Sequence, residues 1–218
     1  MRIGALIAIS LLVAGCSHAT DDHWSDSHTT TPPGAPASPA TSAPAAGAPI
    51  AAVIAWIEAA HPVDPAGYHV ATRDGAVTQL DTDIAFSVPG AETRCTTDAE
   101  HAGDVLACLV ELSDPPPRPA TAYGEWRGGW VDFDGITLRI GSARGDPGPF
   151  VHGPGTELAD GDSLFFDNFR CRADPGALYC VNYAHRSAVR FGAAGIEAYG
   201  CLRPAPPPDG TGIAFDCR

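Results

Sequence analysis

Seven cysteines are the residues of this 218-residue chain whose type and spacing most directly suggest chemistry. Cys16 stands alone near the amino terminus, and six others follow much later. An even number of thiols outside the cytoplasm is typical of disulfides. None of the six has a partner at the two-residue spacing of a zinc knuckle, so no metal site is predicted. Six cysteines allow fifteen connectivities, and we favour the nearest-neighbour pattern of Cys95 with Cys108, Cys171 with Cys180 and Cys201 with Cys217.

A serine motif is the next candidate for chemistry. Residues 161–164 read Gly-Asp-Ser-Leu, the letters that mark the nucleophile of the GDSL esterases and lipases. A serine hydroxyl needs an adjacent imidazole to become nucleophilic, and in those hydrolases a downstream Asp-x-x-His pair supplies it. Only 55 residues follow Ser163, and no such pair occurs among them. We interpret the motif as a polar turn entering a strand, with a GDSL-type ester hydrolase as an alternative, and predict no catalytic residue.

Three aromatic residues lie close together in "YGEWRGGWVDFDG": Tyr123, Trp126 and Trp130. Together they could form a platform on which sugar rings stack, with nearby carboxylates accepting hydrogen bonds from hydroxyl groups. The same residues would serve equally as core packing along a strand, which is the reading we favour. A glycan or small-ligand module using the Trp126/Trp130 region is the alternative. Paired carboxylates for glycoside hydrolysis are a weaker possibility in so acidic a chain.

Composition narrows the classes of function. The chain has thirteen arginines and no lysine, which excludes a Walker-type phosphate loop and Schiff-base chemistry. The formal net charge is −13, so nucleic acid is not an expected partner. The histidines are scattered without ligand spacing, and no cofactor is predicted.

The amino terminus has the layout of a secretory signal: Arg2, then an apolar run too short to cross a membrane, then small residues. Val13-Ala14-Gly15-Cys16 resembles the lipobox of bacterial lipoproteins. We therefore expect residues 1–15 to be a signal peptide and Cys16 to carry diacylglycerol and an acyl chain such as palmitate. This would anchor the chain to the cell membrane, on its extracytoplasmic face.

Residues 16–49 are rich in Pro, Ala, Ser and Thr and have no apolar periodicity, so they are predicted to form a disordered tether. Residues 50–218 are expected to form a single β-rich globular domain. Ile50, Val53, Ile54 and Ile57 recur at helical spacing before Pro62, which predicts one amphipathic helix.

Short alternating strands with frequent turns follow this helix. Turns are predicted at Asp74-Gly75, at Asp134-Gly135 and at Asp174-Pro175-Gly176. The last of these is the turn of a hairpin that places Cys171 opposite Cys180. The predicted fold is mainly β: an antiparallel sandwich or open barrel with one N-terminal helix and three disulfides.

Several segments together resemble one family. They are "AFSVPGAETRC", "LACLVEL", "GEWRGGWVDFDG", "GDPGPFVHGPG" and "NFRCRADPGALYCVNYAHRSAVRFGAAGIEAYGC". They are similar to the LppI-like surface lipoproteins of mycobacteria and, more broadly, to small exported actinobacterial proteins. The later part departs from the "GHGF" ending of the broader set, since "AHRS" stands there.

The resemblance implies an envelope location but no activity. We expect a non-enzymatic cell-surface lipoprotein with a binding or structural role. Its expected partners are the membrane, through the lipid on Cys16, and either a cell-wall glycan or an envelope protein. We expect a monomer.

Overall fold

The computed structural model describes residues 42–144 and 147–218. Cys16, the expected signal peptide and most of the expected tether lie outside these residues. The fold is mainly β, with antiparallel-rich sheets, one main helix and three disulfides, as predicted. In the described ranges, no helix combines the length and the apolar character needed to cross a membrane.

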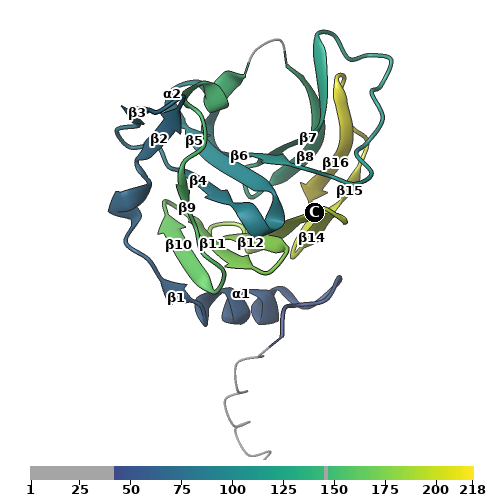
Figure 1. Cartoon of the computed structure of the whole chain (residues 1–218). Coiled ribbons are helices and arrows are strands. Elements are labelled where there is room, and N and C mark those ends of the chain that lie inside the picture. The colour runs from purple at the N-terminus through teal and green to yellow at the C-terminus, as the bar shows by residue number, and fades with distance from the viewer. Residues whose placement is uncertain (1–41, 145–146) are drawn as a thin grey trace, which may run out of the picture. The chain divides into compact units, whose positions relative to one another are not determined.

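The larger sheet has eight strands and forms the upper layer of the molecule in Figure 1. Its neighbours pair antiparallel except at one edge, where β9 runs parallel to β4. The order is β15 (Leu202–Ala205), β16 (Thr211–Cys217), β8 (Thr137–Arg144), β7 (Glu125–Phe133), β6 (Gly103–Val110), β5 (Thr93–Asp98), β4 (Ala85–Val88) and β9 (Thr156–Glu157).

The smaller sheet has six strands and lies below the larger one in Figure 1. Its edge strand β1 pairs parallel with β10, and all other neighbours are antiparallel. The order is β1 (His61–Pro62), β10 (Asp162–Phe166), β11 (Phe169–Asp174), β12 (Ala177–Asn182), β13 (Ser187–Gly192) and β14 (Gly195–Tyr199).

Smaller elements complete the fold. The hairpin β2–β3 projects beside the larger sheet and turns through Asp74 and Gly75, which both have positive φ, as the sequence predicts. The remaining elements are α1 (Ile50–Glu58), η1 (Pro65–Tyr68), β2 (Val70–Arg73), β3 (Ala76–Gln79), η2 (Pro89–Ala91), α2 (Ala99–Ala102) and η3 (Gly148–His152).

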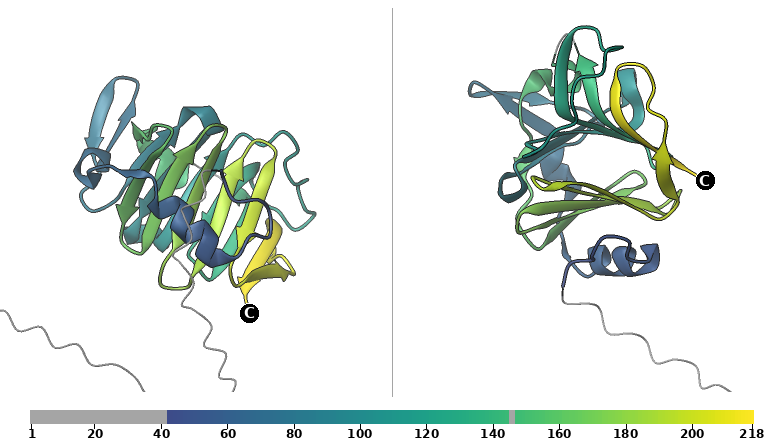
Figure 2. Two further views of the ribbon diagram at one scale, coloured as in Figure 1. Left: turned by 90° about the horizontal axis from the view of Figure 1, so that it is seen from below. Right: turned by 90° about the vertical axis from the view of Figure 1, so that its right-hand side faces the viewer.

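The two sheets pack face to face as a sandwich (Figure 2), because the longer strands place apolar residues inward to form a shared core. On β7, Val131 and Phe133 are completely buried, and Phe133 packs edge-on against Phe169 of the other sheet. Cys95 and Cys108 belong to this core, as do Cys171 and Cys180. The alternation therefore decides which residues remain on the outer faces.

Helix α1 covers the outer face of the six-stranded sheet (Figure 2). Val53 and Ile57 are buried there, as the helical spacing predicts, and Trp56 is buried beside them. The Trp56 ring lies edge-on to Tyr179, with centroids 4.8 Å apart, and the Arg172 guanidinium sits 3.6 Å from the Trp56 ring centroid. Burial of Arg172 lowers its pKa.

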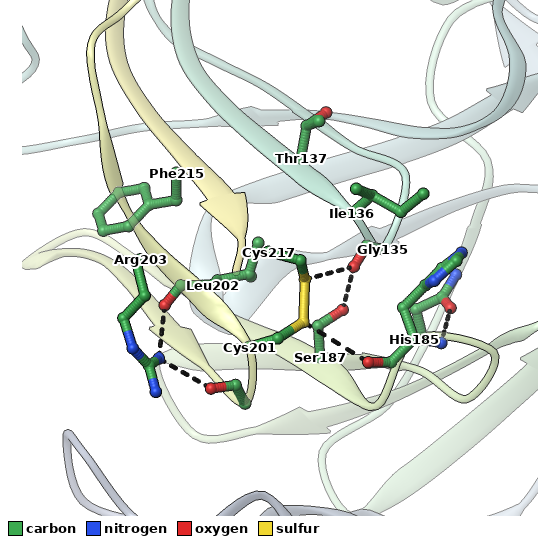
Figure 3. The surroundings of a disulfide bond; sticks show 12 residues. Gly135, Ile136, Thr137, His185, Ser187, Cys201, Leu202, Arg203, Phe215 and Cys217 are labelled. Atoms are coloured by element: carbon green, nitrogen blue, oxygen red, sulfur yellow. Dashed lines mark hydrogen bonds between the residues drawn. A yellow bond between two sulfur atoms is a disulfide. The ribbon is translucent and has the colours of Figure 1, made fainter.

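The three disulfides have the predicted pairing. Cys95 and Cys108 are register partners in one sheet, and Cys171 and Cys180 are register partners in the other. The third pair joins the end of β16 to the turn between β14 and β15, where the chain passes from one sheet to the other (Figure 3). There Cys217 Sγ lies 3.4 Å from the carbonyl oxygen of Gly135, which also accepts a hydrogen bond from the Ser187 hydroxyl.

Candidate ligand-binding site

Ser163 lies inside β10 and not at an exposed elbow. The residue is 1% exposed, and its Oγ lies 3.5 Å from the main-chain oxygen of His61. The His61 ring faces Asp162, with 3.1 Å between Nδ1 and Oδ1. Because neighbouring residues of a strand point to opposite faces, Ser163 and Asp162 do not share a face. Among the described residues, this geometry brings no imidazole to the Ser163 hydroxyl.

The three aromatic residues predicted as a platform or as core make separate contacts. Trp130 is 1% exposed, and its ring packs edge-on against Phe150 with centroids 5.1 Å apart. Trp126 is half-buried and donates its indole N–H to the carbonyl oxygen of Pro116. Tyr123 is 90% exposed. Trp130 is thus part of the packing, while Trp126 and Tyr123 retain exposed surface.

The described histidines, cysteines and acids include no group of three or more that could hold a metal ion.

A concave site of about 460 Å³ lies on the outer face of the eight-stranded sheet, beside Trp130. We call it the arginine pocket, because three of the thirteen arginines line it. Its lining residues are Thr72, Arg73, Asp74, Arg94, Leu109, Arg127, Trp130, Pro147, Phe150, Gly153 and Pro154.

A row of register partners forms the floor of the arginine pocket. Arg94 on β5 lies opposite Leu109 on β6, and Leu109 lies opposite Trp130 on β7. Cys95, Cys108 and Val131, each adjacent in sequence to a member of the row, are buried in the core, so all three members of the row point outward. Across these three adjacent strands, the side chain changes from the cationic Arg94 to the aliphatic Leu109 and then to the aromatic Trp130.

The segment around η3 builds the wall above this row. Phe150 from η3 covers the Trp130 ring. The chain then passes close to β2 at Gly153, whose φ is +89° and where a Cβ atom would lie 2.3 Å from the main-chain oxygen of Thr72. The Thr72 amide donates to the carbonyl oxygen of Pro154 at 2.9 Å. A residue with a side chain would not allow this approach, so Gly153 defines the side of the pocket.

The three guanidinium groups are only partly used by the protein. Arg73 Nη1 donates to the main-chain oxygen of Val151 at 2.9 Å, and Arg73 Nε lies 3.8 Å from Asp74. Arg127 Nη2 lies 3.2 Å from a Glu125 carboxylate oxygen, and Arg127 Nε has no hydrogen-bond partner in the described part of the chain. Arg94 is exposed and makes no hydrogen bond or ion pair with a residue that the structure describes.

A second depression, of about 530 Å³, borders η3 and is acidic. Two of its four acids, Asp83 and Asp98, are occupied by local contacts. Asp83 accepts from the Thr97 hydroxyl and the Ala99 amide, both at 2.9 Å. Asp98 accepts from the His101 amide and lies 2.9 Å from His101 Nδ1; this hydrogen bond, together with nearby carboxylates, raises the pKa of His101. These contacts explain Asp83 and Asp98 as turn and cap residues, and we assign no ligand to this depression.

Comparisons with known proteins add no assignment: no family model, no curated protein and no solved structure matches the chain. Trp130 was among the residues predicted from the sequence, whereas the arginines beside it were not. The sequence held one signal for this pocket, which was the alternation along β7. Trp130 is a large aromatic residue on the face opposite Val131 and Phe133. The other lining residues come from distant segments and had no shared spacing.

Proposed function

We propose that this chain is a lipid-anchored binding domain of the cell envelope, attached through Cys16 and binding a small ligand in the arginine pocket. The pocket is the observation that carries the proposal. Its volume of about 460 Å³ falls within the range of roughly 300–1,000 Å³ typical of small-ligand sites, and it combines an apolar floor with a few polar groups. The resemblance to LppI-like lipoproteins supports the envelope location.

The position of the pocket suits an anchored receptor. Helix α1 and the start of the described chain lie on the outer side of the six-stranded sheet (Figure 1). The arginine pocket lies on the outer side of the eight-stranded sheet, because the row from Arg94 to Trp130 points away from the core. The two outer faces of a sandwich are opposite each other. In a domain anchored through its amino terminus, the pocket would therefore lie on the face opposite the one that the amino-terminal segment joins.

The anchor is tested by metabolic labelling with an alkyne-tagged fatty acid in an actinobacterial host. We expect label on the wild-type chain and on the control variant Ser17→Ala, and no label on Cys16→Ser. The membrane fraction should hold the two labelled proteins and lose Cys16→Ser. Label that persists in Cys16→Ser, or no label on any of the three, would refute the lipid anchor.

The binding role is tested by screening a library of small charged and neutral fragments by nuclear magnetic resonance. We expect hits that shift the Gly153 amide and the Trp130 indole N–H. Thr72→Trp should block these shifts by filling the pocket, because Thr72 is an exposed lining residue. Val77→Trp is the matched control, since Val77 is the exposed cross-strand partner of Thr72 and does not line the pocket. A library that shifts no pocket resonance would refute the assignment.

A second candidate is a glycan-binding surface at Tyr123 and Trp126, favoured by the 90% exposure of Tyr123. Soluble cell-wall oligosaccharides would then shift the Trp126 indole resonance and leave that of Trp130 unchanged. The reverse pattern would place the glycan in the arginine pocket.

A further inference from the structure

We infer that the arginine pocket selects ligands that carry an oxyanion, a carboxylate or a phosphate monoester, on a flat apolar body. This inference rests on the proposed binding role and names the chemical class of the ligand. It depends on three observations: the local charge of the lining, the unused donors of its arginines, and the order of side chains along its floor.

The lining is cationic within an acidic protein. Three arginines face the pocket, and Asp74 is the only acid among its described lining residues, whereas the whole chain carries a net charge of −13. Charges in solvent are screened over about 8 Å at physiological ionic strength. Glu125 does not line the pocket but pairs with Arg127 at 3.2 Å and offsets its charge. The more distant carboxylates weaken anion binding little, and Arg94 and Arg73 leave the lining cationic.

Donors for an oxyanion are present, and those of Arg94 are unused within the described residues. Arg94 makes no contact that would neutralise it within the described residues, and Arg127 gives one terminal nitrogen to Glu125. A guanidinium presents its N–H groups as a planar fork that matches both oxygens of a carboxylate or phosphate. Arg73 is held on the rim by its hydrogen bond to Val151. An anion in the pocket could therefore bind Arg94 without breaking an ion pair that the structure describes.

The floor fixes how such a ligand would lie. Adjacent strands are about 4.8 Å apart, so two steps across the sheet, from Arg94 over Leu109 to Trp130, span about 10 Å. A bicyclic aromatic acid has about this length. Its anionic group would meet Arg94, and its ring system would cover Leu109 and end against Phe150, which packs on the Trp130 ring.

The test compares three probes on the purified chain by calorimetry and by nuclear magnetic resonance: 2-naphthoate, 2-naphthyl phosphate and the neutral amide 2-naphthamide. We expect both anions to bind at least tenfold more tightly than the amide and to shift the Gly153 amide. Comparison of the two anions shows whether a carboxylate or a phosphate is preferred. We expect Arg94→Gln to weaken anion binding about tenfold and to leave amide binding within twofold.

The matched control is Arg218→Gln, which removes the same charge from an exposed residue that does not line the pocket. It should change no dissociation constant by more than twofold. Equal binding of the amide and the anions, or equal weakening by both substitutions, would overturn the oxyanion inference while leaving the pocket as a ligand site. If no probe bound while other fragments shifted the pocket resonances, the inference alone would fail. If no molecule shifted them, both the inference and the proposed function would fail.

Discussion

The contact between Trp56 and Arg172 should contribute strongly to the stability of the domain. Trp56 is 1% exposed, between helix α1 and the six-stranded sheet. The Arg172 side chain is 15% exposed; its guanidinium lies over the Trp56 ring, and its Nη1 donates to the main-chain oxygen of Trp56 at 2.6 Å. The perturbation is Trp56→Ala, which removes the ring and leaves that main-chain acceptor in place.

The magnitude follows from burial and from the ring contacts. A buried tryptophan replaced by alanine typically costs about 3–5 kcal/mol. A desolvated cation–π contact accounts for roughly 1–2 kcal/mol of this, since the guanidinium is only 3.6 Å from the ring centroid. We therefore expect Trp56→Ala to lower the free energy of unfolding by about 4 kcal/mol. Combined with Arg172→Met in a double-mutant cycle, it should give a coupling energy of about 1–2 kcal/mol.

The assay is urea unfolding at pH 7, followed by circular dichroism with the disulfides oxidised. Ile54→Ala is a control, because Ile54 lies on the same helix and is only partly buried. It should cost less than Trp56→Ala. A loss below about 1.5 kcal/mol for Trp56→Ala, or a coupling energy near zero, would show that α1 is not packed on the sheet as described.

Two further predictions concern pH and backbone geometry. Burial raises the pKa of Tyr183 to about 12, with a smaller contribution from the hydrogen bond to Glu58. The folded state therefore keeps the phenolic proton above pH 10, where the unfolded state loses it. The free energy of unfolding should therefore fall between pH 10 and pH 12, and Tyr183→Phe should make this fall shallower in alkaline denaturation; an unchanged slope contradicts the assignment. Gly153→Ala should lower the midpoint of thermal unfolding more than Gly161→Ala. Both residues have positive φ, but only at Gly153 would a Cβ atom meet main-chain atoms. Equal shifts would show that the close approach of this segment to β2 does not depend on Gly153.

The sequence predicted those parts of the fold that depend on neighbours along the chain. Alternation and turn residues are local signals, and they identified the hairpin of β11 and β12. A symmetric hairpin about Asp174-Pro175-Gly176 makes Cys171 and Cys180 register partners, so this disulfide followed from strand pairing. Helix α1 was predicted from its apolar spacing, although Trp56 was not counted among its buried residues.

Features made by distant segments could not be predicted in the same way. The parallel pairs β1–β10 and β4–β9 join strands about 70–100 residues apart, with no alternation or turn that specifies them. The arginine pocket is likewise formed by segments that are distant in the sequence. Arg94 is an ordinary outward residue of β5 in the sequence, and only the register across three strands places it near Trp130.

Arg73 and Arg127 of the pocket make contacts within the protein, and we expect Arg94 alone not to be needed for folding. Trp130 is already covered by Phe150, while Arg94 makes no stabilising contact among the described residues. Placing Arg94 close to Arg73 and Arg127 brings like charges together, which is unfavourable for the folded state. Arg94→Gln should therefore leave the free energy of unfolding unchanged or raise it by about 0.5 kcal/mol at low salt, with the gain disappearing in 1 M NaCl.

A residue that weakens the fold slightly and binds nothing within it is typical of a functional site, where stability is given up for activity. Urea titrations of Arg94→Gln at low and high salt measure this directly. A loss of more than about 1 kcal/mol would show that Arg94 is a structural residue and that its guanidinium is not free to bind a ligand.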